Sequence, residues 1–114
     1  MFIWNMLHNC GGARAIYGNL TNLFYSSNLA RDTEPSLFVG TGVTMESIDQ
    51  NSAVYSFMTD MAFVYPYVDY STDNINDTLT WPWLERYISR RYSLHSIEKV
   101  DFAMKAWNIL WRNS

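Results

Sequence analysis

Glu46 is the residue of this sequence whose type and position most directly suggest chemistry. It follows an apolar run with two glycines, Leu37 to Met45. The run predicts a strand covered on both faces, in which Gly40 and Gly42 let neighbouring backbone or a ligand approach closely. In parallel α/β folds, catalytic groups lie at the carboxyl ends of strands. Glu46 is therefore a candidate catalytic acid, although a carboxylate in this position more often caps a helix or is solvated.

A helix is predicted directly after this acid. Ser47 and Gln50 have the spacing of a capping box, and Asp49 adds negative charge near the positive end of the helix. Apolar side chains then recur at helical spacing at Val54, Phe57, Met58, Met61 and Tyr65. A strand, an acid and a helix in this order make half of a βαβ unit.

A second polar group lies at the end of an earlier predicted strand, residues 2–9. Its side chains alternate between two faces, with Trp4, Met6, His8 and Cys10 on one face and Asn5, Leu7 and Asn9 on the other. Polarity rises toward the carboxyl end, as in a barrel strand that reaches a polar pocket. His8 and Asn9 could equally satisfy backbone groups of a loop, and for each alone that structural role is slightly favoured.

The remaining elements follow from helix breakers and apolar periodicity. After Gly11-Gly12, a helix is predicted to about Tyr25, followed by a connecting loop over residues 26–36. Pro66 ends the helix that follows Glu46. The polar residues after it make 67–80 a linker between a first part, 1–66, and a helical part, 81–114.

Two amphipathic helices are predicted in the last part. Pro82 suits the first turn of one helix, and a second is expected from Ser96. One face of the first helix is predicted at Trp83, Leu84, Tyr87, Ile88 and Arg91. The apolar face of the second is predicted at Val100, Met104, Trp107 and Trp111, and Ala103 and Leu110 widen it. Aromatic stripes of this kind are far more often core than ligand site.

Composition excludes several classes of function. The 114 residues are 48% hydrophobic, which argues against disorder, and the net charge of -3 leaves no basic stripe for nucleic acid. The sequence has no apolar run of 18 residues and no secretion signal at its start. A single cysteine excludes an internal disulfide framework, and neither a metal site nor a cofactor is predicted, because His8 and His95 lack ligand spacing.

The start of the chain and two glycosylation triplets bear on its origin. Met1 leads directly into a predicted buried strand, so we expect a truncated chain or a gene model that begins at an internal methionine. The triplets Asn19-Leu-Thr and Asn76-Asp-Thr are compatible with a secretory route. Asn76, in a predicted polar loop, is the preferred acceptor.

Four segments of the chain carry a resemblance to a known family. The sequence Val39-Gly-Thr-Gly-Val-Thr-Met-Glu-Ser-Ile-Asp-Gln-Asn51 is similar to the segment of the alpha-N-acetylglucosaminidases, a retaining glycosidase family, that carries the nucleophilic glutamate. Residues 2–12 resemble the family's Trp-x-Met-Leu-His-Asn-Phe-Gly-Gly stretch. Downstream, Arg90-Arg91-Tyr92 and Ala106-Trp107 resemble parts of its helical domain, so the likeness covers nearly the whole chain.

This resemblance implies a fold, an activity and a site. The fold would be the last βα units of a (β/α)8 barrel followed by part of an all-α domain. Glu46 would be the nucleophile of a hydrolase that removes terminal alpha-linked N-acetylglucosamine, as in heparan sulfate, in lysosomes, and His8, Asn9 and Cys10 would bind the sugar. The acid/base glutamate of the family lies on an earlier strand, so we expect this chain alone to be inactive without the remainder of the parent enzyme.

The chain departs from the family pattern near the site. Cys10 stands where a phenylalanine is common, Ser47 where a glycine follows the nucleophile, and Ala13 where an asparagine is usual. These changes fit a diverged paralogue or inactive remnant as well as an enzyme. Such a remnant would act through its aromatic face, by association with a partner or with itself. A Cys10 nucleophile with His8 as its base is a weaker alternative, because no third orienting group is evident.

Overall fold

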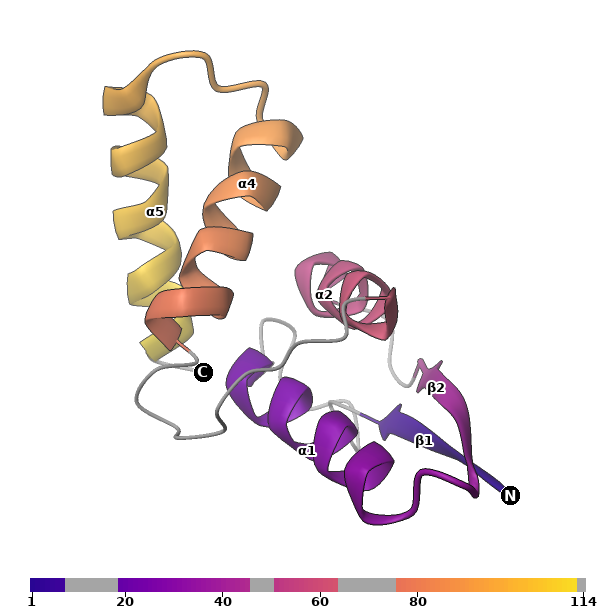
Figure 1. Cartoon of the computed structure of the whole chain (residues 1–114). Helices are drawn as coiled ribbons and strands as arrows, with labels where there is room; N and C mark the ends of the chain where they lie inside the picture. Colours follow the sequence, from indigo (N-terminus) through magenta and orange to yellow (C-terminus); the bar gives the residue numbers. More distant parts are fainter. Residues whose placement is uncertain (8–18, 46–50, 64–75, 113–114) are drawn as a thin grey trace. The chain divides into compact units, whose positions relative to one another are not determined.

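The computed structural model describes residues 1–7, 19–45, 51–63 and 76–112 in two compact units, 1–68 and 69–114. Figure 1 shows the elements in chain order. The first unit contains β1 (Phe2–Leu7), α1 (Leu20–Thr33), β2 (Phe38–Thr44) and α2 (Ser52–Phe63), and the second contains η1 (Asn76–Thr80), α4 (Trp81–Arg91) and α5 (Ile97–Arg112). The predicted order of strands and helices, with a helical last part, is confirmed.

The two strands of the first unit form a parallel pair. From Ile3 opposite Gly40, the register continues to Leu7 opposite Thr44. Parallel strands need a crossover connection, and α1 lies in it. At the amino end, the rings of Phe2 and Phe38 meet edge to face with centroids 5.8 Å apart, and the Arg31 guanidinium lies 5.2 Å from the Phe38 centroid. This end of the pair is therefore closed by aromatic packing.

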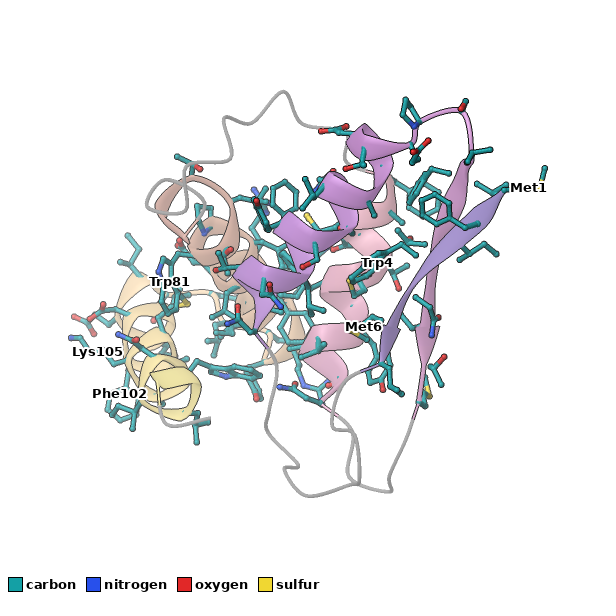
Figure 2. All side chains as sticks on the ribbon, turned by 90° about the horizontal axis from the view of Figure 1, so that it is seen from below. Met1, Trp4, Met6, Trp81, Phe102 and Lys105 are labelled. Atoms are coloured by element: carbon teal, nitrogen blue, oxygen red, sulfur yellow. The ribbon has the colours of Figure 1, made fainter. Side chains whose placement is uncertain are left out.

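Helices α1 and α2 pack on one side of the strands and form the core with them. Figure 2 shows both helices on that side. Among the described residues of this unit, the fully or nearly fully buried apolar side chains are Met6, Leu20, Phe24, Ala53, Val54, Phe57, Met58 and Met61. The apolar positions predicted for α2 from Val54 to Met61 are thus confirmed as its buried face.

Helix α1 differs from its prediction. It begins at Leu20 and ends at Thr33, so residues predicted as a loop from position 26 are helical. The prediction was wrong because the polar side chains hydrogen-bond within the helix. Asn28 Nδ2 donates to the Phe24 carbonyl at 2.8 Å, and Thr33 Oγ1 donates to the Leu29 carbonyl at 2.7 Å. Residues that often favour turns are satisfied here by the preceding helical turn.

The second unit is a helical hairpin. Trp83 stacks on Tyr87 within α4, with centroids 5.1 Å apart, and Tyr87 meets Trp107 of α5 edge to face at 6.1 Å. The face predicted for α4 is confirmed, since Trp83, Leu84, Tyr87 and Ile88 are buried. Helix α5 begins after Ser96, as predicted, and the Ser96 hydroxyl accepts from the Lys99 N–H at 3.4 Å. Residues 76–80, predicted as linker, form the π-helix η1.

Candidate active site

The carboxyl ends of β1 and β2 meet at one edge of the strand pair. Leu7 is the last residue of β1 and lies opposite Thr44, the last residue of β2. The four predicted site residues come next in the chain at both ends, with His8, Asn9 and Cys10 directly after β1 and Glu46 two residues after β2. These four residues lie outside the described part of the structure. The described residues therefore define the edge, and the candidate side chains beyond it stay predictions.

The strand face opposite the helices is open. Ile3 and Leu7 of β1 are 62% and 50% exposed, whereas Met6 between them is 2% exposed. This alternation confirms the two faces predicted for β1. The prediction that β2 is covered on both faces is wrong for the described residues. Gly42 and Thr44 lie on the open face, opposite Asn5 and Leu7, and on the other face Val43, opposite Met6, is still 41% exposed. The described pair has no third strand and no second layer to cover it.

An asparagine on the open face links the two strand ends. Asn5 Nδ2 donates a hydrogen bond to the hydroxyl of Thr44. A Cβ on Gly42 would lie 2.7 Å from Asn5 Oδ1, so glycine is required for the asparagine to lie across β2. A Cβ on Gly40 would meet no heavy atom within 4 Å. A close approach is thus found at Gly42, but a side chain makes it and not the neighbouring backbone or ligand that was predicted.

This link was missed by the sequence analysis. The alternation of β1 places Asn5 and Leu7 on one face, but it does not show which residue of β2 lies opposite. The parallel register decides that, by pairing Asn5 with Gly42. The signal in the sequence was Gly42 two residues before Thr44. Gly42 leaves room for a side chain from β1, and the Thr44 hydroxyl can accept a hydrogen bond from it.

The start of α2 is held by Asn51. Its Oδ1 accepts a hydrogen bond from the Ala53 N–H at 3.1 Å, and its carbonyl accepts from the Val54 N–H at 3.0 Å. This is N-cap geometry, and the side chain is 8% exposed. The capping box predicted at Ser47 and Gln50 lies outside the described residues. Asn51 was not predicted as a cap, although asparagine directly before an apolar helical pattern is a recognised signal.

The environment of Tyr55 changes the pKa of its phenol. Tyr55 lies on α2 and is half-buried. Burial raises the pKa of its phenol above the ordinary value of 10.0 because the phenolate loses solvation. Tyr55 is therefore neutral at physiological pH and suits a structural role in the helix layer.

The acidic side chains among the described residues of this unit lie away from the carboxyl ends of the strands. Asp32 is in the last turn of α1, Glu34 follows that helix before β2, and Asp60 is on the exposed side of α2. Among residues 1–7, 19–45, 51–63 and 76–112, no group of three metal-ligating side chains is present. In the same residues, no helix combines the length and apolarity needed to cross a membrane.

A groove lies at the turn between the helices of the second unit. It has a volume of about 510 Å³ and is lined by Glu85, Leu94, His95, Ser96, Ile97, Val100, Asp101 and Met104. The carboxylate of Asp101 is paired with Lys105 at 2.7 Å, and His95 is exposed. These features do not form a catalytic arrangement. The predicted role of the aromatic stripes as core is confirmed on α4, where Trp83 and Tyr87 are buried. On α5, Met104 and Trp107 are half-buried and Leu110 is exposed.

Known proteins resemble the part of the chain that contains the two strands. Residues 1–65 match the model of the alpha-N-acetylglucosaminidase (NAGLU) TIM-barrel domain. The chain belongs to this family. It is 33% identical to human alpha-N-acetylglucosaminidase over 112 residues, which make up 98% of this chain and 13% of the human protein. No solved structure matched the chain.

Membership of the alpha-N-acetylglucosaminidase family agrees with the described fold. The parallel strands and alternating helices of the first unit are what part of a TIM barrel contains. The match covers Glu46 and the stretch from His8 to Cys10. It ends at residue 65, close to the point where the first unit gives way to the second.

Proposed function

We propose that this chain supplies the nucleophile-bearing part of a retaining glycosidase that removes terminal alpha-linked N-acetylglucosamine from glycans such as heparan sulfate. Glu46 is the nucleophile. The observation that carries the proposal is the pairing of Leu7 with Thr44, because it brings the ends of two parallel strands of a TIM-barrel family to one edge. In such barrels, active sites form at this edge.

The open face of the strands supports the choice of Glu46. Within β2, Gly42 and Thr44 lie on the face where Asn5 crosses, and Glu46 has the same parity in the sequence. In a closed barrel, one face of every strand packs on helices and the other lines the interior. Helices α1 and α2 occupy the first face here (Figure 2). The parity of Glu46 in the sequence therefore supports the proposal that it faces the barrel interior.

The reaction requires two carboxyl groups. The ionised carboxylate of Glu46 would attack the anomeric carbon, and the bond from that carbon to the leaving oxygen would break as a second carboxylic acid protonates the oxygen. Water would then release the sugar from Glu46. In retaining enzymes the two groups lie about 5 to 5.5 Å apart. The resemblance assigns the second acid to an earlier strand of the parent barrel.

Three residues after β1 are proposed to bind the sugar. Asn9 has the parity of Asn5 and would reach the interior, where its amide could bind sugar hydroxyls. Resemblance also assigns His8 and Cys10 to the sugar pocket. Cys10 in place of phenylalanine would give a smaller, softer wall and a weaker stacking surface for the sugar.

The chain spans 13% of the human relative, so the complete activity depends on further barrel strands. We propose that the 114 residues alone do not turn over substrate. The remainder of the parent enzyme is the proposed partner, and resemblance assigns the enzyme to the lysosomal or secretory route. The first unit would be the end of the barrel, and the second the start of the helical domain.

The direct test replaces the matching segment of the human enzyme by this chain and measures hydrolysis of an aryl alpha-N-acetylglucosaminide. Glu46→Gln should lower kcat by roughly 10³-fold or more, since it removes the nucleophile. Glu34→Gln is the matched control, because Glu34 precedes β2 and lies at its opposite end. A mechanism-based label should bind the peptide that contains Glu46. A folded chimera in which Glu46→Gln retains full activity would refute the assignment.

The exposed apolar surface favours a second candidate function, which is association. The side chains of Ile3 and Leu7 in β1, Val39 and Val43 in β2, and Met45 directly after β2 are each more than 40% exposed. Exposed apolar strands are surfaces for pairing with another chain. A remnant would associate with itself or with a barrel through these strands, without catalysis. Sedimentation of the 114-residue chain tests this candidate, because a monomer at high concentration would contradict self-association.

A further inference from the structure

The triplet Asn19-Leu20-Thr21 lies at the start of α1. Asn19 is the N-cap, with φ -92° and ψ 92°, and its Oδ1 accepts a hydrogen bond from the Asn22 N–H at 2.8 Å. Its carbonyl accepts from the Leu23 N–H at 3.0 Å. The side chain is exposed. The helix therefore uses both oxygens of Asn19, and the side-chain nitrogen makes no hydrogen bond to the described residues.

We propose that Asn19 carries an N-linked oligosaccharide attached to its side-chain nitrogen. The triplet has the form Asn-X-Thr with a residue other than proline in the middle, which is the acceptor pattern for this modification. The proposal rests on the secretory route that the proposed function implies. It goes beyond that function because it concerns α1 and no residue of the predicted sugar site.

The chemistry agrees with the geometry of the cap. The donor is a lipid-linked oligosaccharide pyrophosphate. A bond forms between Asn19 Nδ2 and the anomeric carbon, the bond from that carbon to the pyrophosphate oxygen breaks, and the pyrophosphate leaves with the electron pair while Nδ2 loses one proton. The product is still an amide. Its Oδ1 keeps its lone pairs, so the hydrogen bond to the Asn22 N–H is retained after modification.

Folding sets the time at which the triplet can be modified. Leu20 is 1% exposed and Thr21 lies in the first turn of α1, so the middle of the triplet is enclosed once the unit has folded. A transferase must hold the asparagine and the threonine together, which requires access to the residue between them. The oligosaccharide is therefore added before α1 packs. Folded chain offered to the transferase should remain unmodified.

The test uses the whole 114-residue chain behind a cleavable secretion leader, translated in the presence of microsomes. A tag with its own acceptor triplet at the carboxyl end reports entry into the lumen. Mass spectrometry of the peptide containing Asn19 should show the oligosaccharide, and an endoglycosidase should remove the mobility shift. Unmodified Asn19 in chains whose tag is modified would overturn the proposal.

Matched variants separate the modification from the cap. Thr21→Ala should abolish modification of Asn19, whereas Thr21→Ser should retain it. Asn19→Asp keeps an oxygen for the cap but lacks the acceptor nitrogen, so the chain should lose one mobility step and keep its helix content by circular dichroism. Asn76 in the second triplet is changed to Gln throughout, so that it adds no step. Because none of these readouts measures hydrolysis, the proposal can fail while the glycosidase assignment stands.

Discussion

The strand pair and the helical hairpin meet the need for burial in different ways. In the hairpin, Trp83, Tyr87 and Trp107 pack against one another across α4 and α5. In the strand pair, one face packs on helices while Ile3 and Leu7 on the other remain exposed. A helix satisfies its own backbone hydrogen bonds, whereas each strand of a parallel pair still has an edge to fill. The strands therefore need further strands of the parent protein beside them. The unpaired edges and the open face show where a barrel would continue.

The largest effect is expected from loss of the aromatic packing in the hairpin. Trp83→Ala should lower the free energy of unfolding of the second unit by about 3 to 5 kcal/mol, since Trp83 is 2% exposed and stacks on Tyr87. Phe102→Ala is the control, because Phe102 is 76% exposed and should cost less than about 0.5 kcal/mol. Urea unfolding followed by circular dichroism measures both. Equal losses would show that the hairpin is not organised around this stack.

The two faces of β1 provide the next test. Met6→Ala should cost about 2 to 5 kcal/mol because the side chain is almost fully buried against the helix layer. Ile3→Ala on the open face should change stability by less than about 0.5 kcal/mol in the 114-residue chain. The comparison sharpens in the chimera with the human enzyme, where the remaining strands should cover the open face. There Ile3→Ala should become destabilising by about 1 kcal/mol or more, and an unchanged small effect would argue against barrel closure over this face.

Sequence patterns predicted the helices and strands of this molecule better than the contacts around them. The 2-residue period of β1 and the helical period of α2 and α4 identify their buried faces, because periodicity depends on local geometry. The end of α1 was missed because Asn28 and Thr33 form hydrogen bonds to preceding carbonyls that turn propensity does not reveal. The open face of β2 was missed because the sequence of an interior strand is the same whether or not its neighbours are present. The hydrogen bond between Asn5 and Thr44 depends on register, which is a non-local property.

The glycines of β2 offer a smaller, matched comparison. Gly40→Ala should stabilise the first unit by about 0.4 to 1 kcal/mol, since the new Cβ meets no atom and the unfolded chain loses freedom. Gly42→Ala should lack this gain, because its Cβ would displace Asn5 and break a hydrogen bond worth about 0.5 to 1.5 kcal/mol. Adding Asn5→Ala should remove the difference between the two glycine variants. Thermal unfolding of both glycine variants, each with and without Asn5→Ala, measures it. An equal gain at both glycines would show that Asn5 does not cross β2.

The smallest effect concerns the pH dependence of the first unit. Burial raises the pKa of Tyr55 in the folded chain. Its phenol is therefore protonated in both states well below pH 10.0, and the two states differ in this proton at higher pH. The unfolded chain then loses its proton first, and stability falls as the pH rises from 10.0 through the higher pKa of the folded state. Tyr55→Phe should flatten that decline when unfolding of the first unit is measured between pH 9 and pH 11. The hairpin is the control: in a Trp4→Phe background its unfolding is followed by tryptophan fluorescence, and Tyr55→Phe should not change its stability. If Tyr55→Phe leaves the alkaline decline of the first unit unaltered, the phenol is solvated and α2 does not enclose it.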